Sequence, residues 1–334
     1  MSVAYDVLGI GNAIVDVLAQ AEDEFLDRHG LRKSEMALIT AERAELLYAD
    51  MAAAVEISGG SAANTIAGIA GLGGRGVYIG KVRDDQLGAI FAHDIRAAGV
   101  TFTTAMAQDG PPTARSMVLI TPDAQRTMNT YLGACVELGP EDVDGDQVTA
   151  AAITYMEGYL WDPPRAKEAF RKAIALAHGA GRRTALSLSD MFCVERHRDE
   201  FLALLQGDID IVFANEDEAK ALFQTDSLDT AVAALRERVQ LAAVTRSEKG
   251  SLLIDSTGTH EIPAAPVEQV VDTTGAGDLY AAGLLFGLTN GYALPDAGRI
   301  ASLAAGEIIA HVGARPQQSL QALLAERGLV PEPV

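Results

Sequence analysis

The stretch from Asp272 to Asp278, D-T-T-G-A-G-D, holds the residues best suited to chemistry, and a long Ala- and Leu-rich segment follows it. Gly275, Ala276 and Gly277 place backbone N–H groups at the start of the helix expected there, where the helix dipole favours an anion such as a phosphate. A carboxylate beside an anion is costly unless it does work, and Asp278 is suited to accept a proton from a hydroxyl. An aspartate in the first turn of an ordinary helix is the alternative, but it leaves the rest of the heptapeptide unexplained.

A second group of small and polar residues, Ser58 to Asn64 (S-G-G-S-A-A-N), opens another expected helix. The paired glycines, Gly59 and Gly60, permit positive φ and let the backbone approach a ligand closely. Ser61 and Asn64 then offer short polar side chains in the first helical turn. The same residues also fit a tight turn in which Ser61 caps the helix, so this motif alone leaves both interpretations open.

Asn12 and Asp16 follow the apolar run Tyr5–Ile10 in the stretch G-I-G-N-A-I-V-D. We expect them at the carboxyl end of a strand, which is where open α/β sheets bind ligands. An aspartate at this place could accept two hydrogen bonds from a diol. Alternatively, Asp16 has no ligand and only caps a turn. The dinucleotide fingerprint is a poor match, because Ile14 stands where its third glycine is required.

Asn215 and Glu218 lie three residues apart after the apolar run Ile211–Ala214, so they share a face of the expected helix. An amide and a carboxylate beside phosphates suit hydrated magnesium, which takes few direct protein ligands. The same pair also fits a capping box at the helix start. A P-loop is excluded, since Lys81 is followed by Val82 where a serine or threonine is required.

The elements that must position these residues alternate along the chain. Short apolar runs and Ala-rich amphipathic segments predict an α/β fold, with a mainly parallel sheet flanked by helices on both faces. The expected strands are Tyr5–Ile10, Val77–Ile79, Ile153–Met156, Thr184–Leu188, Ile211–Ala214, Ala243–Thr245 and Ser251–Ile254. The expected helices are Ala41–Val55, Ala62–Leu72, Gln86–Ala98, Pro164–His178, Arg198–Leu205, Glu216–Phe223, Thr230–Arg238, Gly275–Thr289, Pro295–His311 and Ser319–Arg327.

Two regions, about 17–57 and about 101–132, break the alternation with polar and short β-type pieces. We expect these two insertions to pair into a small β-sheet lid over the large α/β domain, within one unit that spans residues 1–334. Prolines at 111, 112 and 122 punctuate the second region as turns.

Composition narrows the function classes. The 334 residues carry 26 Lys and Arg against 46 Asp and Glu, a net charge of −20, which argues against a nucleic-acid partner because phosphate backbones are held by clustered cations. The two cysteines, Cys135 and Cys193, fit a reducing compartment without disulfides. Neither a signal peptide nor a membrane span is indicated, so we expect a cytoplasmic protein. The histidine spacing is wrong for zinc hydrolases, and no serine hydrolase motif occurs.

The motifs G-G-S-A-A-N and D-T-T-G-A-G-D, with N-E-D-E-A between them, resemble the ribokinase-like (PfkB) family of carbohydrate and nucleoside kinases over nearly the whole chain. The resemblance implies an α/β domain with a two-part β lid, and ATP-dependent phosphorylation of a hydroxymethyl group on a nucleoside or sugar. It makes Asp278 the general base and the N–H groups of Gly275, Ala276 and Gly277 the anion hole. It leaves monomer and homodimer both open.

The resemblance also assigns the two sides of the site. The substrate side is formed by Asn12, Asp16, Gly59, Gly60, Ser61 and Asn64. On the nucleotide side, Asn215 and Glu218 would organise Mg²⁺ through water, while V-T-R-S-E-K-G-S resembles a nucleotide-binding loop containing Thr245, Arg246, Ser247 and Gly250. Ser247 departs from the family's usual glycine. A potassium ion is also implied, near Asp272, Thr274 and the segment after His311.

Within the family, four stretches resemble adenosine kinases. R-T-M-N-T-Y-L-G-A-C supplies Leu132 and Ala134 for a base pocket, Y-M-E-G-Y-L-W supplies Tyr159, and L-S-L-S-D-M-F supplies Phe192, with F-A-N-E-D-E-A after it. Leu38 of the first insertion would close over the base. Phosphorylation of the adenosine 5′-hydroxyl is therefore the expected reaction. A sugar kinase, a kinase for another nucleoside and a non-catalytic nucleoside-binding protein are the alternatives, and Thr274 departs from the Asn of eukaryotic adenosine kinases.

Overall fold

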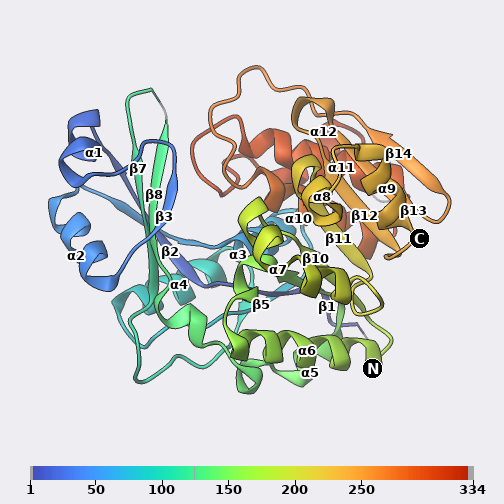
Figure 1. Ribbon diagram of the computed structural model, residues 1–334, viewed down its shortest axis with the longest axis horizontal. Helices are drawn as coiled ribbons and strands as arrows, with labels where there is room; N and C mark the ends of the chain where they lie inside the picture. The colour runs from blue at the N-terminus through green and yellow to red at the C-terminus, as the bar shows by residue number, and fades with distance from the viewer. Residues whose placement is uncertain (1–2, 124, 330–334) are drawn as a thin grey trace.

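Two β-sheets organise the chain in the computed structural model, which describes residues 3–123 and 125–329 (Figure 1). The larger sheet is parallel from β12 to β6, and β13 and β14 extend it as antiparallel edge strands. Its spatial order is β14 (Gly258–Ile262), β13 (Ser251–Asp255), β12 (Leu241–Thr245), β11 (Ile211–Asn215), β10 (Arg183–Ser187), β9 (Ala151–Glu157), β1 (Tyr5–Ile10), β5 (Gly76–Ile79) and β6 (Thr101–Phe102).

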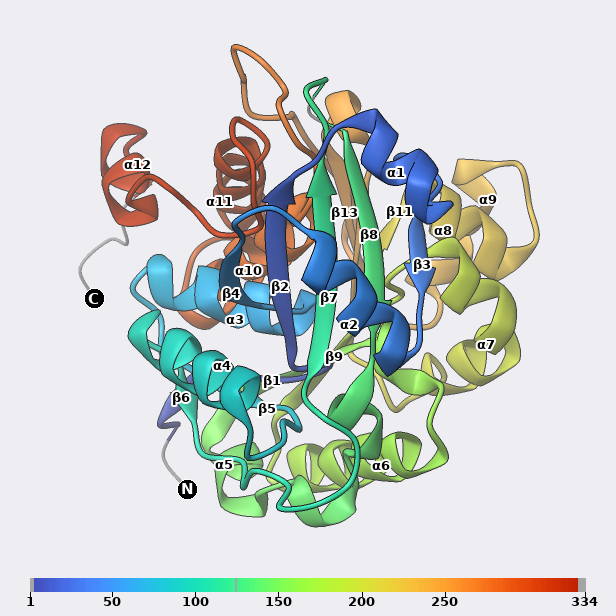
Figure 2. The same ribbon diagram turned by 90° about the vertical axis from the view of Figure 1, so that its left-hand side faces the viewer.

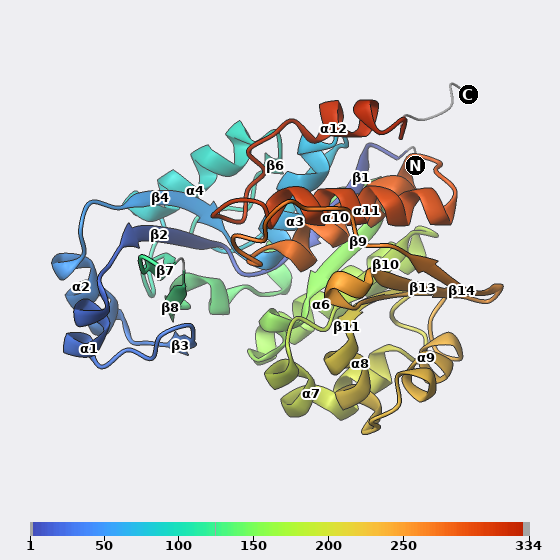
Figure 3. The ribbon, with the colours of Figure 1, turned by 90° about the horizontal axis from the view of Figure 1, so that it is seen from above.

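Helices cover both faces of this sheet (Figure 3), because successive strand residues point to opposite sides. In β1, Val7 belongs to one buried cluster and Leu8 to the other. The first cluster includes residues of α3 (Ser61–Gly71), α4 (Gln86–Ala97), α10 (Ala276–Thr289), α11 (Leu294–Ile308) and α12 (Leu320–Glu326). The second includes residues of α5 (Gly145–Ala150), α6 (Pro164–Gly179), α7 (Met191–Leu204), α8 (Glu216–Phe223) and α9 (Leu228–Arg236). Short 3₁₀ turns are η1 (Gly133–Glu137), η2 (Pro140–Asp142), η3 (Gly158–Trp161) and η4 (Ser247–Lys249).

The smaller sheet is built from chain segments that precede and follow β5 and β6 in the sequence. Its spatial order is β3 (Met36–Leu38), β8 (Arg126–Tyr131), β7 (Ala114–Ile120), β2 (Ile14–Gln20) and β4 (Val55–Gly59). Figure 2 shows α1 (Asp23–His29) and α2 (Ala41–Asp50) lying over one face of it. Val15 and Val17 of β2 pack on that side in the same buried cluster as Phe25 and Leu47 of the two helices.

The opposite face of the smaller sheet carries a polar row. The strand registers align Asp16 with Ser116, Ser116 with Thr130, and Thr130 with Leu38. Ser116 and Thr130 are buried and their hydroxyls lie 2.8 Å apart. Because alternate residues of a strand point to opposite faces, this row lies on the face away from α1 and α2.

Several element boundaries differ from the expectations. Asp16 lies within β2 of the smaller sheet, not at the end of a strand of the larger one. Residues 101–102, counted in the second insertion, pair with β5 in the larger sheet. The helix expected over 41–55 ends at Asp50, since Val55 already belongs to β4, and α7 begins seven residues before the expected 198. Among the helices of the described residues, none is both long and apolar enough to cross a membrane.

Candidate active site

Asp278 stands where the first turns of α3 and α10 meet. Ser61 Oγ donates to Asp278 Oδ1 at 2.7 Å, and Asn64 Nδ2 donates to Asp278 Oδ2 at 3.0 Å. The helices can approach closely because Gly68 faces α10: a Cβ added there would lie 2.8 Å from Ala282 Cβ. Ser61 is thus a partner of the carboxylate and not the helix cap, which is Gly60.

Burial raises the pKa of Asp278 above its ordinary value, against the lowering effect of Ser61, Asn64 and the positive charge of Arg315. A raised pKa brings a carboxyl group closer to the range in which it accepts and releases protons near neutral pH. The arrangement therefore suits a general base whose two oxygens are already oriented.

The loop before α10 is shaped for an anion. Gly275 caps the helix with φ +79°, and a Cβ at that position would lie 3.2 Å from Ala314 Cα, so glycine is required on both counts. In the described part of the chain, the N–H groups of Gly275 and Gly277 meet no acceptor. The Ala276 N–H was expected in the anion hole, but it donates to Thr273 O at 3.2 Å instead. Two of the three expected anion-hole donors are thus free.

Asn12 and Asp16 approach the glycine pair closely. A Cβ on Gly59 would lie 2.4 Å from Asp16 Oδ2, and a Cβ on Gly60 would lie 2.1 Å from Asn12 O. Burial raises the pKa of Asp16 to about 6, and Arg315 and Arg126 lower it. The structure therefore brings these sequence-predicted residues together with Ser61 and Asn64 at one corner.

Glu157, at the carboxyl end of β9, is a residue that the sequence reasoning missed. It is 1% exposed; its Oε1 accepts hydrogen bonds from the backbone N–H and the side chain of Asn12 at 2.7 and 2.8 Å, and its Oε2 accepts from Ala62 N at 2.7 Å. Burial raises its pKa to about 7 against these three donors. A lone acidic residue ending the apolar run A-I-T-Y-M was the available signal.

Asp272 accepts hydrogen bonds from two backbone donors and forms an ion pair with one arginine. Its Oδ1 accepts from Thr274 N at 3.0 Å, and its Oδ2 accepts from Gly313 N at 3.1 Å and lies 3.0 Å from Arg126 Nε. The positive charge at this carboxylate comes from Arg126 of the smaller sheet, which the sequence reasoning did not assign to the site. The expected potassium ion stays a prediction of the sequence, and we derive no step through it.

Asn215 and Glu218 form the capping box that was the alternative to a magnesium site. Asn215 Oδ1 accepts from Glu218 N at 2.8 Å, and the two Glu218 oxygens accept from Asn215 N and Nδ2 at 3.0 and 2.6 Å. Each carboxylate oxygen keeps a further lone pair, so the pair still fits a cation held through water. Burial raises the pKa of Glu218 to about 7.

The expected nucleotide loop follows β12, whose last residue pairs with the last residue of β11, Thr245 with Asn215. Ser247 replaces a glycine yet adopts a left-handed φ of +50°, so the loop keeps a path that suits glycine. Gly250 has φ +80°, and a Cβ there would lie 2.0 Å from Ile262 O. Arg246 N donates to Gly250 O at 2.7 Å and closes the turn.

The residues expected to contact a base lie on four separate elements. Phe192 in the first turn of α7 is 70% exposed, Leu38 on β3 is 57% exposed, and Tyr159 in η3 is 37% exposed. Tyr159 OH donates to Ser189 O at 3.2 Å. Leu132 is half-buried, whereas Ala134 is fully buried and has no surface to offer a ligand in this conformation.

Comparisons with known proteins show which family this chain resembles. The match to the pfkB family carbohydrate kinases covers residues 38–320. The chain is 28% identical to the adenosine kinase of Saccharomyces cerevisiae, over 84% of this chain and 88% of that protein. The structure of adenosine kinase from Sinorhizobium meliloti is 57% identical, with a TM-score of 0.90 over 97% of this chain and 99% of that one.

A probable sugar kinase from Rhizobium etli CFN 42 is 52% identical, with a TM-score of 0.92 over 98% of this chain and all of that one. Curated relatives also include sugar kinases, such as a fructokinase of Escherichia coli at 27% identity over 70% of this chain and 77% of that protein. Adenosine kinase from Schistosoma mansoni, at 22% identity and a TM-score of 0.80, shares the fold. This chain belongs to the pfkB family of carbohydrate kinases and is a phosphotransferase with a hydroxyl group as acceptor.

Proposed function

We propose that this chain transfers the γ-phosphoryl group of ATP to the 5′-hydroxyl of adenosine and releases AMP and ADP. The 57% identity with the adenosine kinase of Sinorhizobium meliloti, across 97% of this chain, carries the proposal. Tyr159 and Phe192 support it, because exposed aromatic rings suit stacking against a nucleobase. Leu38 and Leu132 add apolar surface for the same base, and Ala134 joins them only if η1 moves.

Asp278 takes the proton of the attacking hydroxyl. As it does so, the hydroxyl oxygen forms a bond to the γ-phosphorus, and the bond from that phosphorus to the bridging oxygen of ADP breaks. Ser61 and Asn64 position the carboxylate through both of its oxygens. Asn12 and Asp16 hold the ribose diol, and Gly59 and Gly60 give them room.

The free N–H groups of Gly275 and Gly277 stabilise the charge that develops on the migrating phosphoryl group, a large contribution in such sites. Asn215 and Glu218 would hold Mg²⁺ through water, and the ion, when bound, would supply positive charge that offsets the charge of the phosphates. The loop with Thr245, Arg246, Ser247 and Gly250 receives the nucleotide. The smaller sheet serves as the lid, and its closure excludes water and limits wasteful ATP hydrolysis.

A sugar kinase is the second candidate, and the 52% identity with the Rhizobium etli protein, a probable sugar kinase, favours it. The catalytic corner is the same for both candidates, because each phosphorylates a hydroxyl. They differ at the exposed aromatic residues, which a free sugar does not require.

A coupled ADP-release assay with ATP and magnesium tests the proposal. The acceptors are adenosine, inosine, guanosine, cytidine, ribose, fructose and 2-keto-3-deoxygluconate. We expect adenosine to give the highest kcat/KM by at least about tenfold, the value of one good stacking contact. A higher kcat/KM with a free sugar or another nucleoside would overturn the adenosine assignment and leave the kinase chemistry intact.

A further inference from the structure

Arg315 lies in the loop after α11 and binds two elements far away in the sequence. Its Nη2 donates to Ser58 O and Ser58 Oγ, both at 2.9 Å, and its Nη1 donates to Ala63 O at 3.2 Å. Ser58 belongs to β4 of the smaller sheet, and Ala63 belongs to the first turn of α3. Arg315 therefore ties the two elements together at the glycine pair that joins them.

The same loop also touches the anion site. Gly313 N donates to Asp272 Oδ2 at 3.1 Å, and Ala314 packs against the place where a Cβ of Gly275 would be. Three consecutive loop residues thus contact the anion-site loop and the joint between β4 and α3. Ser61 and Asn64, which hold Asp278, lie on either side of Ala63 in the same helical turn.

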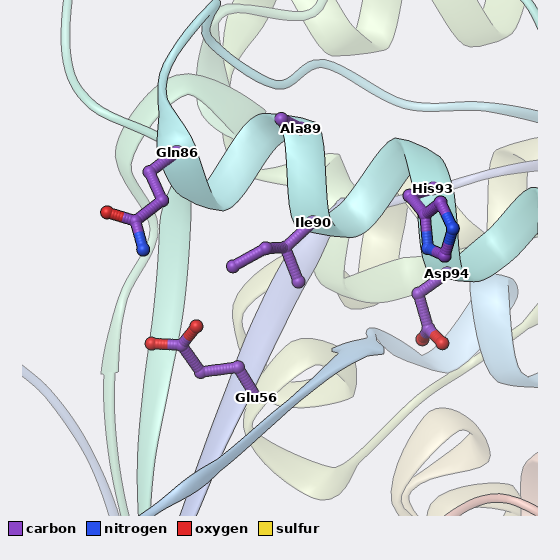
Figure 4. Close-up of a pocket in the computed structure, with 6 residues that line it drawn as sticks. All are labelled: Glu56, Gln86, Ala89, Ile90, His93 and Asp94. Carbon is purple, nitrogen blue, oxygen red and sulfur yellow. The ribbon is translucent and has the colours of Figure 1, made fainter.

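Asp94 of α4 completes the joint from the other side. Its Oδ2 accepts from Ser58 N at 2.7 Å, so both backbone polar groups of Ser58 are engaged by charged side chains. Asp94 lines a groove of about 450 Å³ between α4 and β4 with Glu56, Gln86, Ala89, Ile90 and His93 (Figure 4). Figure 4 shows the Asp94 side chain pointing from α4 toward the end of β4.

The titratable groups around Arg315 come from four elements. Asp94 of α4, Asp16 of β2, Asp278 of α10 and the Tyr78 phenol of β5 all act on its guanidinium, and burial lowers its pKa. In the other direction, Arg315 lowers the pKa of both Asp16 and Asp278. Loss of the Arg315 charge should therefore raise the pKa of both carboxylates. Asp16 keeps a second cation, Arg126, and the buried Glu157, whose pKa is about 7, also acts on Asp278.

We infer that Arg315 is a positioning residue for phosphoryl transfer: it holds the joint between β4 and the helical turn that carries Ser61 and Asn64 to Asp278, and it places a buried positive charge at this corner. This inference rests on the proposed role of Asp278 as the general base. It assigns no contact between Arg315 and the substrate. Substitutions distinguish the role of the charge from the role of the hydrogen bonds, because glutamine at position 315 removes the positive charge whereas lysine keeps it.

The test compares kcat/KM at pH 8.5 and pH 6.0 in R315Q, R315K and the wild type, with melting temperature as a second readout. We expect R315Q to raise the ratio of kcat/KM at pH 8.5 to kcat/KM at pH 6.0 by more than about twofold, because a higher pKa of the corner carboxylates lowers activity more at the acid pH. R315K keeps the positive charge, so its ratio should stay within about twofold of the wild-type ratio. A purely structural role lowers activity equally at both pH values, and that result in R315Q overturns the inference.

Two matched controls separate charge from structure. D94N loosens the same joint but leaves the Arg315 charge, so it should lower the melting temperature and keep the wild-type ratio; a changed ratio contradicts the inference. R299Q removes an exposed arginine that pairs only with Asp296 among the described residues and should alter neither readout. If R315Q fails to fold, R315Q/D94N removes both opposing charges, and its ratio is compared with that of D94N.

The proposed function fails separately. If D278N keeps near-wild-type turnover, the base assignment is wrong and the inference falls with it. If D278N is inactive while R315Q and R315K share the wild-type ratio, only the inference about Arg315 is wrong.

Discussion

The proposed catalytic corner and the proposed base-facing rim of this molecule are built in opposite ways. In the catalytic corner, formed by Ser61, Asn64, Glu157 and Asp278, each carboxylate oxygen accepts a hydrogen bond. The base-facing rim, formed by Leu38, Tyr159 and Phe192, is apolar and exposed. The first arrangement fixes reacting groups before substrate arrives, whereas the second leaves surface that a bound base would cover.

Under the proposed function, this difference would let relatives of one fold keep the same proton acceptor and phosphorylate different substrates. A proton acceptor must stay within hydrogen-bond reach of its hydroxyl, so its neighbours are constrained. A stacking residue requires only an apolar face at a suitable distance. The predictions below test this contrast, first at the corner and then at the rim.

D278N should have the largest effect. The amide cannot accept a proton at neutral pH, so kcat should fall about a thousandfold or more, within the range of general-base catalysis. The variant should fold, because an amide keeps the size of the carboxyl and one acceptor for Ser61. Steady-state kinetics and circular dichroism check the two statements, and nucleoside binding by calorimetry should survive.

E157Q tests whether the corner depends on its buried support. The glutamine offers one oxygen to the three N–H donors of Asn12 and Ala62, so an unsatisfied buried donor should cost about 1–3 kcal/mol of unfolding free energy. Urea denaturation measures this cost. An unchanged unfolding free energy would show that the corner tolerates loss of the carboxylate.

The same variant carries a pH prediction. The Glu157 pKa is 4.5 in the unfolded chain and about 7 in the folded protein, so the folded state binds this proton more tightly. Through this group, the wild-type protein should lose stability as pH rises from about 4.5 to about 7. E157Q should be flatter than the wild type over that window when both are unfolded in urea at pH 5 and pH 7.5.

F192A tests the rim. Because Phe192 is 70% exposed, its loss should leave the melting temperature within about 1 °C, as for most exposed sites. The KM for adenosine should rise about tenfold, the cost of one lost stacking contact, with little change in kcat. L46A is the matched control, since Leu46 is an equally apolar side chain, 60% exposed, on α2. Equal KM values for F192A and wild type would remove Phe192 from the base site.

L38A should show the smallest effect. An exposed leucine at the edge of the smaller sheet contributes part of one apolar contact, so KM for adenosine should rise about threefold. Turnover of any accepted free sugar should be unaffected, because a sugar does not reach the base position. A matching loss with sugar and nucleoside would mean that Leu38 acts on closure of the smaller sheet and not on base recognition.

Local patterns carried most of the fold prediction. The seven expected strands all fall within strands of the larger sheet or extend one by a single residue, because buried parallel strands are continuous apolar runs. The smaller sheet was expected only as two insertions without strand bounds, because strands such as β4 and β8 mix polar and apolar residues. The residue Asp16 was recognised as important, yet its place on β2 became clear only from pairing with β4 and β7.

The sequence by itself determined the family chemistry. Gly275, Gly277 and Asp278 lie within four residues, and the capping box of Asn215 and Glu218 spans one helical turn. Neighbours in sequence remain neighbours in space, so their spacing shows what they can do together.

Only the tertiary structure decided how these motifs are supported. Glu157 lies 145 positions from Asn12, Asp278 lies 217 from Ser61, and Arg315 lies 257 from Ser58. A hydrogen bond across such a separation leaves no periodicity in the sequence, because its partners are brought together by the packing of whole strands and helices. For the same reason the burial of Ala134 and the pairing of Arg126 with Asp272 emerged only once the two sheets were in place.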